Sequence, residues 1–306
     1  MKMTMSMRVN AYLARRRALG YKLTKEGLLL LNFARYADRV GHRGPLTREL
    51  ALRWATLPRN AHQSYRARRL QTLGVFARFQ IALEPATELL PRHVLGPVHS
   101  RRPPHIFSAH QLRHLLKRAD FLRGRLQPLT YRTLIGLLAC SGLRISEALA
   151  LTTKDVDFHQ AVLHVGQSKY QHSRLVPLHR AVLPHLCRYQ RRRNKICPEA
   201  KHFFVSETGD AVGYFNACRT FRGLARQVRP SNGRRNVRLH DLRHTFACRV
   251  LLTWQRSHRG AIGRMLTLSR VMGHTHVRDT YWYLSAFPDL LQQVAGAFAP
   301  FDPSVV

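Results

Sequence analysis

The chain has 306 residues, and its 51 Lys and Arg outnumber its 16 Asp and Glu, so the formal net charge at pH 7 is +35. Hydrophobic residues make up 45% and aromatic residues 9% of the chain. This is enough apolar material for a packed core, and it excludes a wholly disordered basic tail. At this length we expect one large domain or two ordinary ones.

Both parts of the chain share the positive charge. Residues 1–100 contain 18 basic and 5 acidic side chains, and residues 101–306 contain 33 and 11. The charge is therefore not an appended arm. A folded chain with such an excess repels itself unless a polyanion neutralises it, which favours a nucleic acid partner over the rival, an anionic membrane surface.

Further features indicate where the protein works. No run of about 18 apolar residues exists that could span a bilayer, and the opening MKMTMSMRVN lacks the apolar core of a signal peptide. The 5 cysteines are odd in number and are never spaced as CxxC, which argues against a disulfide framework and a structural zinc site. We therefore expect a soluble, cytoplasmic, nucleoid-associated protein without a membrane partner.

Apolar spacing predicts helices throughout the first 95 residues. The expected helices span residues 9–19, 24–40, 47–54 and 62–82, with Thr24 as the N-cap of the second and Gly41 as its stop. These helices would form a small basic domain. Residues 96–107 then combine three prolines, a glycine and two arginines without apolar periodicity, which predicts a linker. Ser108 is the expected N-cap of the helix that opens a second domain.

The second domain, residues 108–306, carries helical patterns with one β-rich interruption. The helical segments are 109–120, 127–140, 144–151, 179–194, 212–228, 240–255 and 287–298. Between them, apolar residues alternate from Val156 to Val165, a polar turn follows at 167–173, and Leu175 to Leu178 close a hairpin. Residues 202–205 are a further short strand. The chain is thus predicted to be mainly α with a small β-sheet or hairpin.

The first cluster that could carry chemistry is ACSGLRISEAL, residues 139–149. Gly142 ends one helical run and Arg144 begins the next. An arginine there can aim its guanidinium across a helix start, where backbone N–H groups also favour an anion. The alternative is one more solvated surface arginine.

The second cluster is LHDLRHTFA, residues 239–247. His240 and Arg243 are three apart on a helix and share a face. His244 follows His240 at the spacing of a two-histidine zinc site, but that site needs Glu where this chain has Asp241, and Arg243 would lie beside the dication. The alternative to a catalytic pair is a structural histidine next to a surface arginine.

The third cluster is RVMGHTHVRDTYWYLSA, residues 270–286. His274 follows a glycine helix stop, and Tyr283 comes nine residues later, with Tyr281 two residues before it. Two residues rotate a helix by about 200°, so these tyrosines face opposite ways and at most one can enter a given site.

In this order, the three clusters resemble the motifs of the tyrosine recombinase (phage integrase) family. SGLRISEAL is similar to the motif that holds the first catalytic arginine, which carries over to Arg144. HDLRHTFA is similar to the motif of a histidine and a second arginine, which gives His240 and Arg243. MGH followed nine residues later by a tyrosine is similar to the end of the family's site, which gives His274 and Tyr283.

The predicted hairpin extends the resemblance. GQSKYQHSRLVPL, residues 166–178, is similar to the family's β-hairpin ending in Arg-x-x-Pro-Leu, and Lys169 falls where the catalytic lysine lies. The family's turn often has a second basic residue where this chain has His172. A solvated turn lysine is the alternative interpretation.

The resemblance implies a mechanism that needs neither a metal, nor ATP, nor another cofactor. Tyr283 would attack a DNA phosphodiester, form a 3′-phosphotyrosyl bond and free a 5′-hydroxyl. Arg144 and Arg243 would clamp the non-bridging oxygens, and His274 would hydrogen-bond the phosphate. Lys169 would protonate the departing oxygen, and His240 would help to take the tyrosine proton.

Two carboxylates beside these arginines could be mistaken for catalytic acids. For Glu147 and Asp241 we expect an orienting role, in which each carboxylate holds a neighbouring base or backbone group.

By the same resemblance, residues 1–95 are a helical core-binding (SAM-like) domain, 96–107 a linker, and 108–306 the catalytic domain, together forming a two-domain clamp on double-stranded DNA. The resemblance also implies a homotetramer on two DNA sites, a monomer when free, and room for accessory recombinases. Residues 289–298 have an apolar stripe that could dock on a neighbouring protomer or pack within one chain.

Two other functions fit parts of the pattern. A DNA-binding protein with this fold but no reaction would have no use for a phenol beside two arginines, and a type IB topoisomerase would use the same chemistry on one duplex. The core-binding domain and linker favour recombination. The opening YLARRRALGY resembles transposon-encoded integrases, which favours a mobile element, while integration, transposition and resolution of replicon dimers all stay open.

Overall fold

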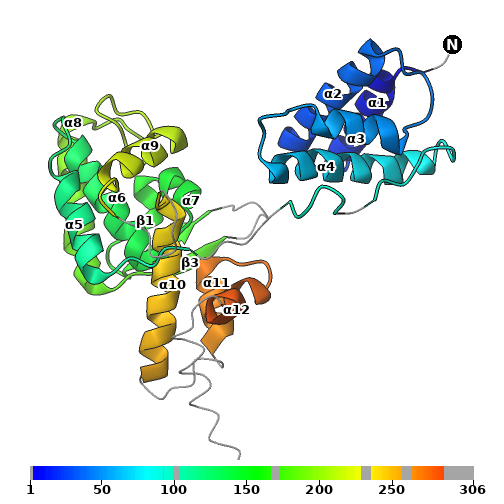
Figure 1. The fold of residues 1–306 in the computed structure, drawn as a ribbon. Helices are drawn as coiled ribbons and strands as arrows, with labels where there is room; N and C mark the ends of the chain where they lie inside the picture. Colours follow the sequence, from blue (N-terminus) through cyan, green and yellow to red (C-terminus); the bar gives the residue numbers. More distant parts are fainter. Residues whose placement is uncertain are drawn as a thin grey trace, which may run out of the picture. The chain divides into compact units, whose positions relative to one another are not determined.

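The computed structural model describes residues 3–91, 93–98, 104–166, 173–228, 236–256 and 264–285, and for 255–256 and 282–285 it describes the backbone alone. The chain divides into two compact units, Met1–Arg102 and Pro103–Val306 (Figure 1). The expected linker, 96–107, spans the boundary between them. None of the helices in the described ranges is both long and apolar enough to cross a membrane.

The first unit is built from helices. They are α1 (Met5–Ala18), α2 (Thr24–Arg39), α3 (Arg48–Thr56) and α4 (Gln63–Ile81). Phe33, Trp54 and Phe76 lie fully buried in their common core. The predicted N-cap of α2 is wrong: Thr24 is already helical, and the cap is Leu23, whose φ of 42° is left-handed.

The second unit is also mainly helical. Its α-helices are α5 (Ala109–Ala119), α6 (Gln127–Ser141), α7 (Ile145–Ala150), α8 (Leu183–Ile196), α9 (Tyr214–Leu224), α10 (Leu239–Arg256), α11 (Met265–Met272) and α12 (Arg278–Ser285), with short 3-10 helices η1 (Thr153–Asp155) and η2 (Arg180–Val182). Ser108 caps α5 as predicted, in a capping box with Gln111. The apolar helix α6 contacts α5, α8 and α10 and so lies at the centre of this unit.

A small antiparallel sheet interrupts these helices, in the order β1 (Val156–Asp157), β2 (Val162–Val165) and β3 (Arg174–Pro177). The predicted mainly helical fold with a small sheet is confirmed. The alternating run from Val156 to Val165 is two strands rather than one, because the chain turns at 158–161, where Ala161 has a φ of 57°. The predicted strand at 202–205 is wrong, since the backbone there makes isolated bridges instead.

Several predicted features lie outside the described residues. Lys169 belongs to the connection between β2 and β3, and the predicted C-terminal helix at 287–298, with its stripe at 289–298, follows α12.

Candidate active site

The C-terminal end of α11 gathers three arginines from three other elements. The helix stops at Gly273, whose φ of 66° is left-handed, and a helix end leaves its last carbonyls without helical partners. Three consecutive carbonyls each accept a hydrogen bond from a different arginine: Val271 from Arg174 (2.8 Å), Met272 from Arg243 (2.7 Å) and Gly273 from Arg144 (2.7 Å). The partial negative charge of a helix C-terminus favours such cations. This end of α11 therefore joins β3, α10 and the start of α7.

Arg144 is held in place by Glu147. Gly142 ends α6 in the left-handed region, with a φ of 66°, so that Arg144 becomes the N-cap of α7. The Glu147 carboxylate accepts hydrogen bonds from the Arg144 backbone N–H (2.9 Å) and from its guanidinium (2.8 Å). This is the orienting arrangement expected for Glu147.

Arg174 binds the same carboxylate from the other side. Its two terminal nitrogens donate to the Glu147 oxygens at 3.1 and 2.8 Å. Burial alone would raise the pKa of Glu147, but the hydrogen bonds and charges of Arg174 and Arg144 outweigh it and hold that pKa below its ordinary value. Glu147 is therefore ionised at neutral pH, and the two arginines with one carboxylate keep a net charge of about +1.

Arg243 is anchored on the main chain. It is 2% exposed, and its guanidinium donates to the carbonyls of Gly142 (2.6 Å) and Met272 (2.7 Å). These two acceptors are uncharged main-chain groups, and they fix the position of the guanidinium. The C-terminal ends of α6 and α11 are thereby tied to α10 through one side chain.

Two histidines lie beside these arginines. His240, near the start of α10, keeps an exposed edge, yet desolvation by the protein around the ring and the charge of Arg243 lower its pKa to about 4. Desolvation, Arg243 and Arg144 likewise lower the pKa of the half-buried His274 to about 4. Both rings are therefore neutral at pH 7.

The helix that bears the predicted nucleophile adjoins this cluster. His274 Nδ1 lies 2.7 Å from the hydroxyl oxygen of Thr280, a buried residue of α12, and α12 contacts both α10 and α11. Tyr283 is in the last turns of α12, although its side chain is outside the described part of the chain. Tyr281, on the same helix, is 45% exposed.

Asp241 orients the start of α10. Its buried carboxylate accepts hydrogen bonds from the backbone N–H of Arg238 (2.8 Å) and from the Arg238 guanidinium (3.0 Å). The second expected orienting carboxylate therefore caps the helix that carries His240 and Arg243.

The structure thus brings together Arg144, His240, Arg243 and His274 with the backbone that carries Tyr283. The sequence did not single out Arg174 as part of this site. Its only signal was the Arg-x-x-Pro-Leu pattern at the end of the hairpin. Fixed positive charges next to neutral imidazoles suit the binding of a phosphodiester and the stabilisation of charge that develops on its oxygens.

Comparisons with known proteins point the same way. Residues 105–288 match the model described as the Phage integrase family. The chain is 36% identical over 302 residues to the putative integrase/recombinase y4rB of Sinorhizobium fredii (strain NBRC 101917 / NGR234), covering 95% of both chains. It is 33% identical over 156 residues to a tyrosine recombinase of Thermosipho africanus (strain TCF52B), covering 51% of this chain and 50% of that one.

Solved structures share the fold. The Tn1549 transposon integrase in complex with transposon right end DNA is similar with a TM-score of 0.72 and 18% identity, over 97% of this chain and 100% of that one. The XerH site-specific recombinase bound to palindromic difH substrate is similar with a TM-score of 0.64 and 16% identity, over 90% and 79%.

Proposed function

Because the chain belongs to the phage integrase family and is a site-specific tyrosine recombinase, we propose that it cuts and rejoins DNA strands through a 3′-phosphotyrosyl intermediate. The proposed active-site residues are Arg144, Lys169, His240, Arg243, His274 and Tyr283. One observation carries this proposal: the arginines are fixed on the end of α11, directly before His274 and the helix that bears Tyr283.

The proposed reaction forms one bond and breaks one. The Tyr283 oxygen bonds to the scissile phosphorus as the bond from phosphorus to the 5′-oxygen breaks. The phenol proton passes to neutral His240, and Lys169 gives a proton to the departing 5′-oxygen. A phenol, with a pKa of about 10, is a better leaving group than an alkoxide, so a second strand's 5′-hydroxyl can reverse the step without ATP.

The arginines would act on the charge of the transition state. Arg144 and Arg243 would donate to the non-bridging oxygens as fixed guanidinium forks, in the role that a metal ion has elsewhere. His274 would hydrogen-bond the same phosphate. Two observations support this assignment. The main-chain anchors of Arg243 hold its guanidinium in place, and Glu147, shared by Arg144 and Arg174, leaves that group a net charge of about +1.

For the whole chain we propose a core-binding role for residues 1–95 and a catalytic role for 108–306, joined by the linker at 96–107, with both parts contacting double-stranded DNA. The net charge of +35 supports this. We also propose that four copies assemble on two DNA sites and that the free protein is a monomer. We further propose that the recombinase acts for a mobile element. The fold shared with the Tn1549 transposon integrase supports the last point.

Trapping of a covalent complex tests the nucleophile. Nicked suicide duplexes that carry candidate element ends should yield a protein–DNA adduct with the native chain. Tyr283→Phe should yield none, while Tyr281→Phe, the matched control on the same helix, should yield as much as the native chain. An adduct that survives Tyr283→Phe and disappears with Tyr281→Phe would overturn the assignment.

A further inference from the structure

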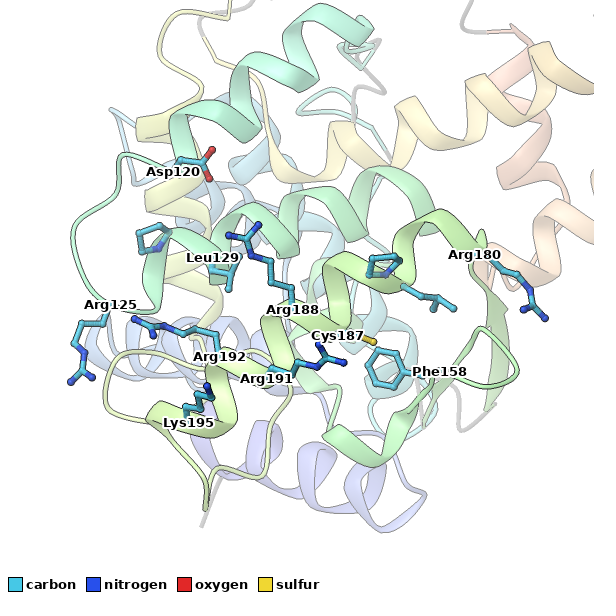
Figure 2. Close-up of a pocket in the computed structure, with 13 residues that line it drawn as sticks. Asp120, Arg125, Leu129, Phe158, Arg180, Cys187, Arg188, Arg191, Arg192 and Lys195 are labelled. Carbon is cyan, nitrogen blue, oxygen red and sulfur yellow. The ribbon is translucent and has the colours of Figure 1, made fainter.

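A second basic concavity lies on the catalytic unit, outside the site just described. It is a groove of about 1010 Å³ along α8 (Figure 2). Its cationic lining residues are Arg125, Arg180, Arg188, Arg191, Arg192 and Lys195. Arg144, His240, Arg243 and His274, whose side chains the structure describes, are not among its lining residues.

The cations of α8 form one face of the helix. Positions 188, 191, 192 and 195 follow helical spacing and are all exposed, whereas Leu186 and Tyr189 are buried on the other side. Arg125, before α6, and Arg180, in η2, approach from outside the helix. The cluster therefore arises from three elements of the fold rather than from one basic stretch.

Little in the groove neutralises this charge. Of the described residues that line it, Asp120 is the one carboxylate, and it is already paired with Arg132. Like charges at helical i, i+3 and i, i+4 spacing repel each other. The dipole at the C-terminus of α8 accounts for a cation such as Lys195, in its last turn, but not for Arg188 or Arg180.

The groove also has an apolar component. Phe158, Leu129 and Cys187 lie among the arginines. Five of its six cations are arginines, whose planar forks match phosphate oxygens with two parallel hydrogen bonds. A sugar–phosphate backbone offers both an anionic edge and the less polar faces of the sugars.

Most of the groove lies away from the active site, although Arg180 at one end follows β3, which contacts α11. In Figure 1, α8 lies well away from α11 and α12 within this unit. Duplex DNA is stiff over about 150 base pairs, far more than a unit of this size spans. Because a duplex is straight over the length of this unit, one that crosses the active site without running along α8 leaves the groove open to a second duplex.

We propose that the groove along α8 binds the phosphate backbone of a second DNA duplex. The recombinase would then hold DNA on two faces of its catalytic unit, one for chemistry and one for capture. Binding there would depend on salt and would not read sequence, because phosphate contacts carry no base information.

A capture assay tests this proposal, and Tyr283→Phe protein keeps it independent of catalysis. A short duplex on beads is saturated with protein and washed, and a labelled second duplex of unrelated sequence is added. We expect retention of the label. The Arg188→Glu/Arg192→Glu variant should lose at least about tenfold in retention, and its salt dependence of capture should be shallower by about two counterions.

The matched control is Arg113→Glu/Lys117→Glu, an exposed i, i+4 pair on α5 that does not line the groove. It should capture the second duplex like the parent protein, and both variants should bind the first duplex normally. Equal loss in both variants, full capture by the groove variant, or no capture by the parent would each overturn the proposal. Displacement of the second duplex by poly-glutamate at equal charge concentration, with no such effect on the first duplex, would assign the groove to an acidic protein instead.

Discussion

Replacement of Arg174 by methionine tests how much the net charge of the site contributes to cleavage. Arg174 shares Glu147 with Arg144, so the three groups carry a net charge of about +1. In Arg174→Met, Arg144 is the one arginine of this pair that still binds the Glu147 carboxylate. The net charge of the cluster then falls to zero, although every residue proposed for catalysis is still present.

The expected losses follow from the geometry. Removing one partner of a buried ion pair costs about 3–5 kcal/mol, and because Glu147 keeps Arg144 we expect the lower end, about 3 kcal/mol of unfolding free energy. If the phosphate binds about 7 Å from the lost charge, one unit of charge at an effective dielectric constant of about 20 contributes about 2.4 kcal/mol. We therefore expect cleavage to slow by about 50-fold.

The assay is the single-turnover rate of covalent adduct formation on a suicide duplex, with protein in excess and thermal unfolding measured in parallel. Arg174→Met/Glu147→Gln restores the net charge to about +1 through Arg144, so it should cleave faster than Arg174→Met. A duplex with a neutral methylphosphonate at the scissile position should shrink the deficit of Arg174→Met, because the phosphate charge is then absent.

Two results would refute this reasoning. One is a double variant that cleaves no faster than Arg174→Met. The other is a deficit that stays the same on the methylphosphonate duplex, which would show that Arg174 acts on the shape of the site rather than on its charge.

Three further outcomes are expected. Arg243→Lys keeps the charge but cannot bridge two carbonyls, so adduct formation per bound complex should fall at least about 100-fold with normal DNA binding, and an unchanged rate would contradict this. Gly273→Ala places a methyl 2.7 Å from a guanidinium at a left-handed φ, so thermal unfolding should show a loss of about 2–4 kcal/mol, against about 1 kcal/mol for the control Gly20→Ala, which is left-handed but open. Burial lowers the pKa of His244 to about 2, below its value of about 6.5 in the unfolded chain. The stability that the neutral ring contributes is therefore fully present above pH 6.5, and it declines by up to about 1.4 kcal/mol per pH unit as the pH falls toward 4. In His244→Gln, the unfolding free energy measured between pH 7 and 5 should depend less on pH.

Local signals in the sequence accounted for much of the fold. Apolar periodicity located α2 and α6 within about a residue, and the left-handed stops at Gly142 and Gly273 were predictable because glycine has no Cβ to resist that conformation. The split between β1 and β2 was not predictable. The sequence pattern of apolar and polar residues does not mark the turn. The turn is made by the left-handed backbone at Ala161.

The geometry of the active site was less predictable from the sequence than the fold. Residue types and order were enough to select Arg144 and Arg243, and Glu147 was marked beside Arg144. The acceptors that hold both arginines at the end of α11 are carbonyls, which every residue possesses and no sequence pattern marks. The groove along α8 depends likewise on long-range folding. Arg125 and Arg180 are 55 positions apart, and nothing local relates them.

The anchoring of three arginines on consecutive carbonyls of α11 has a consequence for how this site can change over generations. A carbonyl stays in place when its side chain is exchanged, so Val271 and Met272 are open to apolar substitution that preserves the helix. Gly273 has no such freedom, because both its backbone conformation and its neighbour exclude a side chain. We therefore expect substitutions at the flanking positions but not at Gly273. In distant homologues this glycine should indicate an active site better than the residues that flank it.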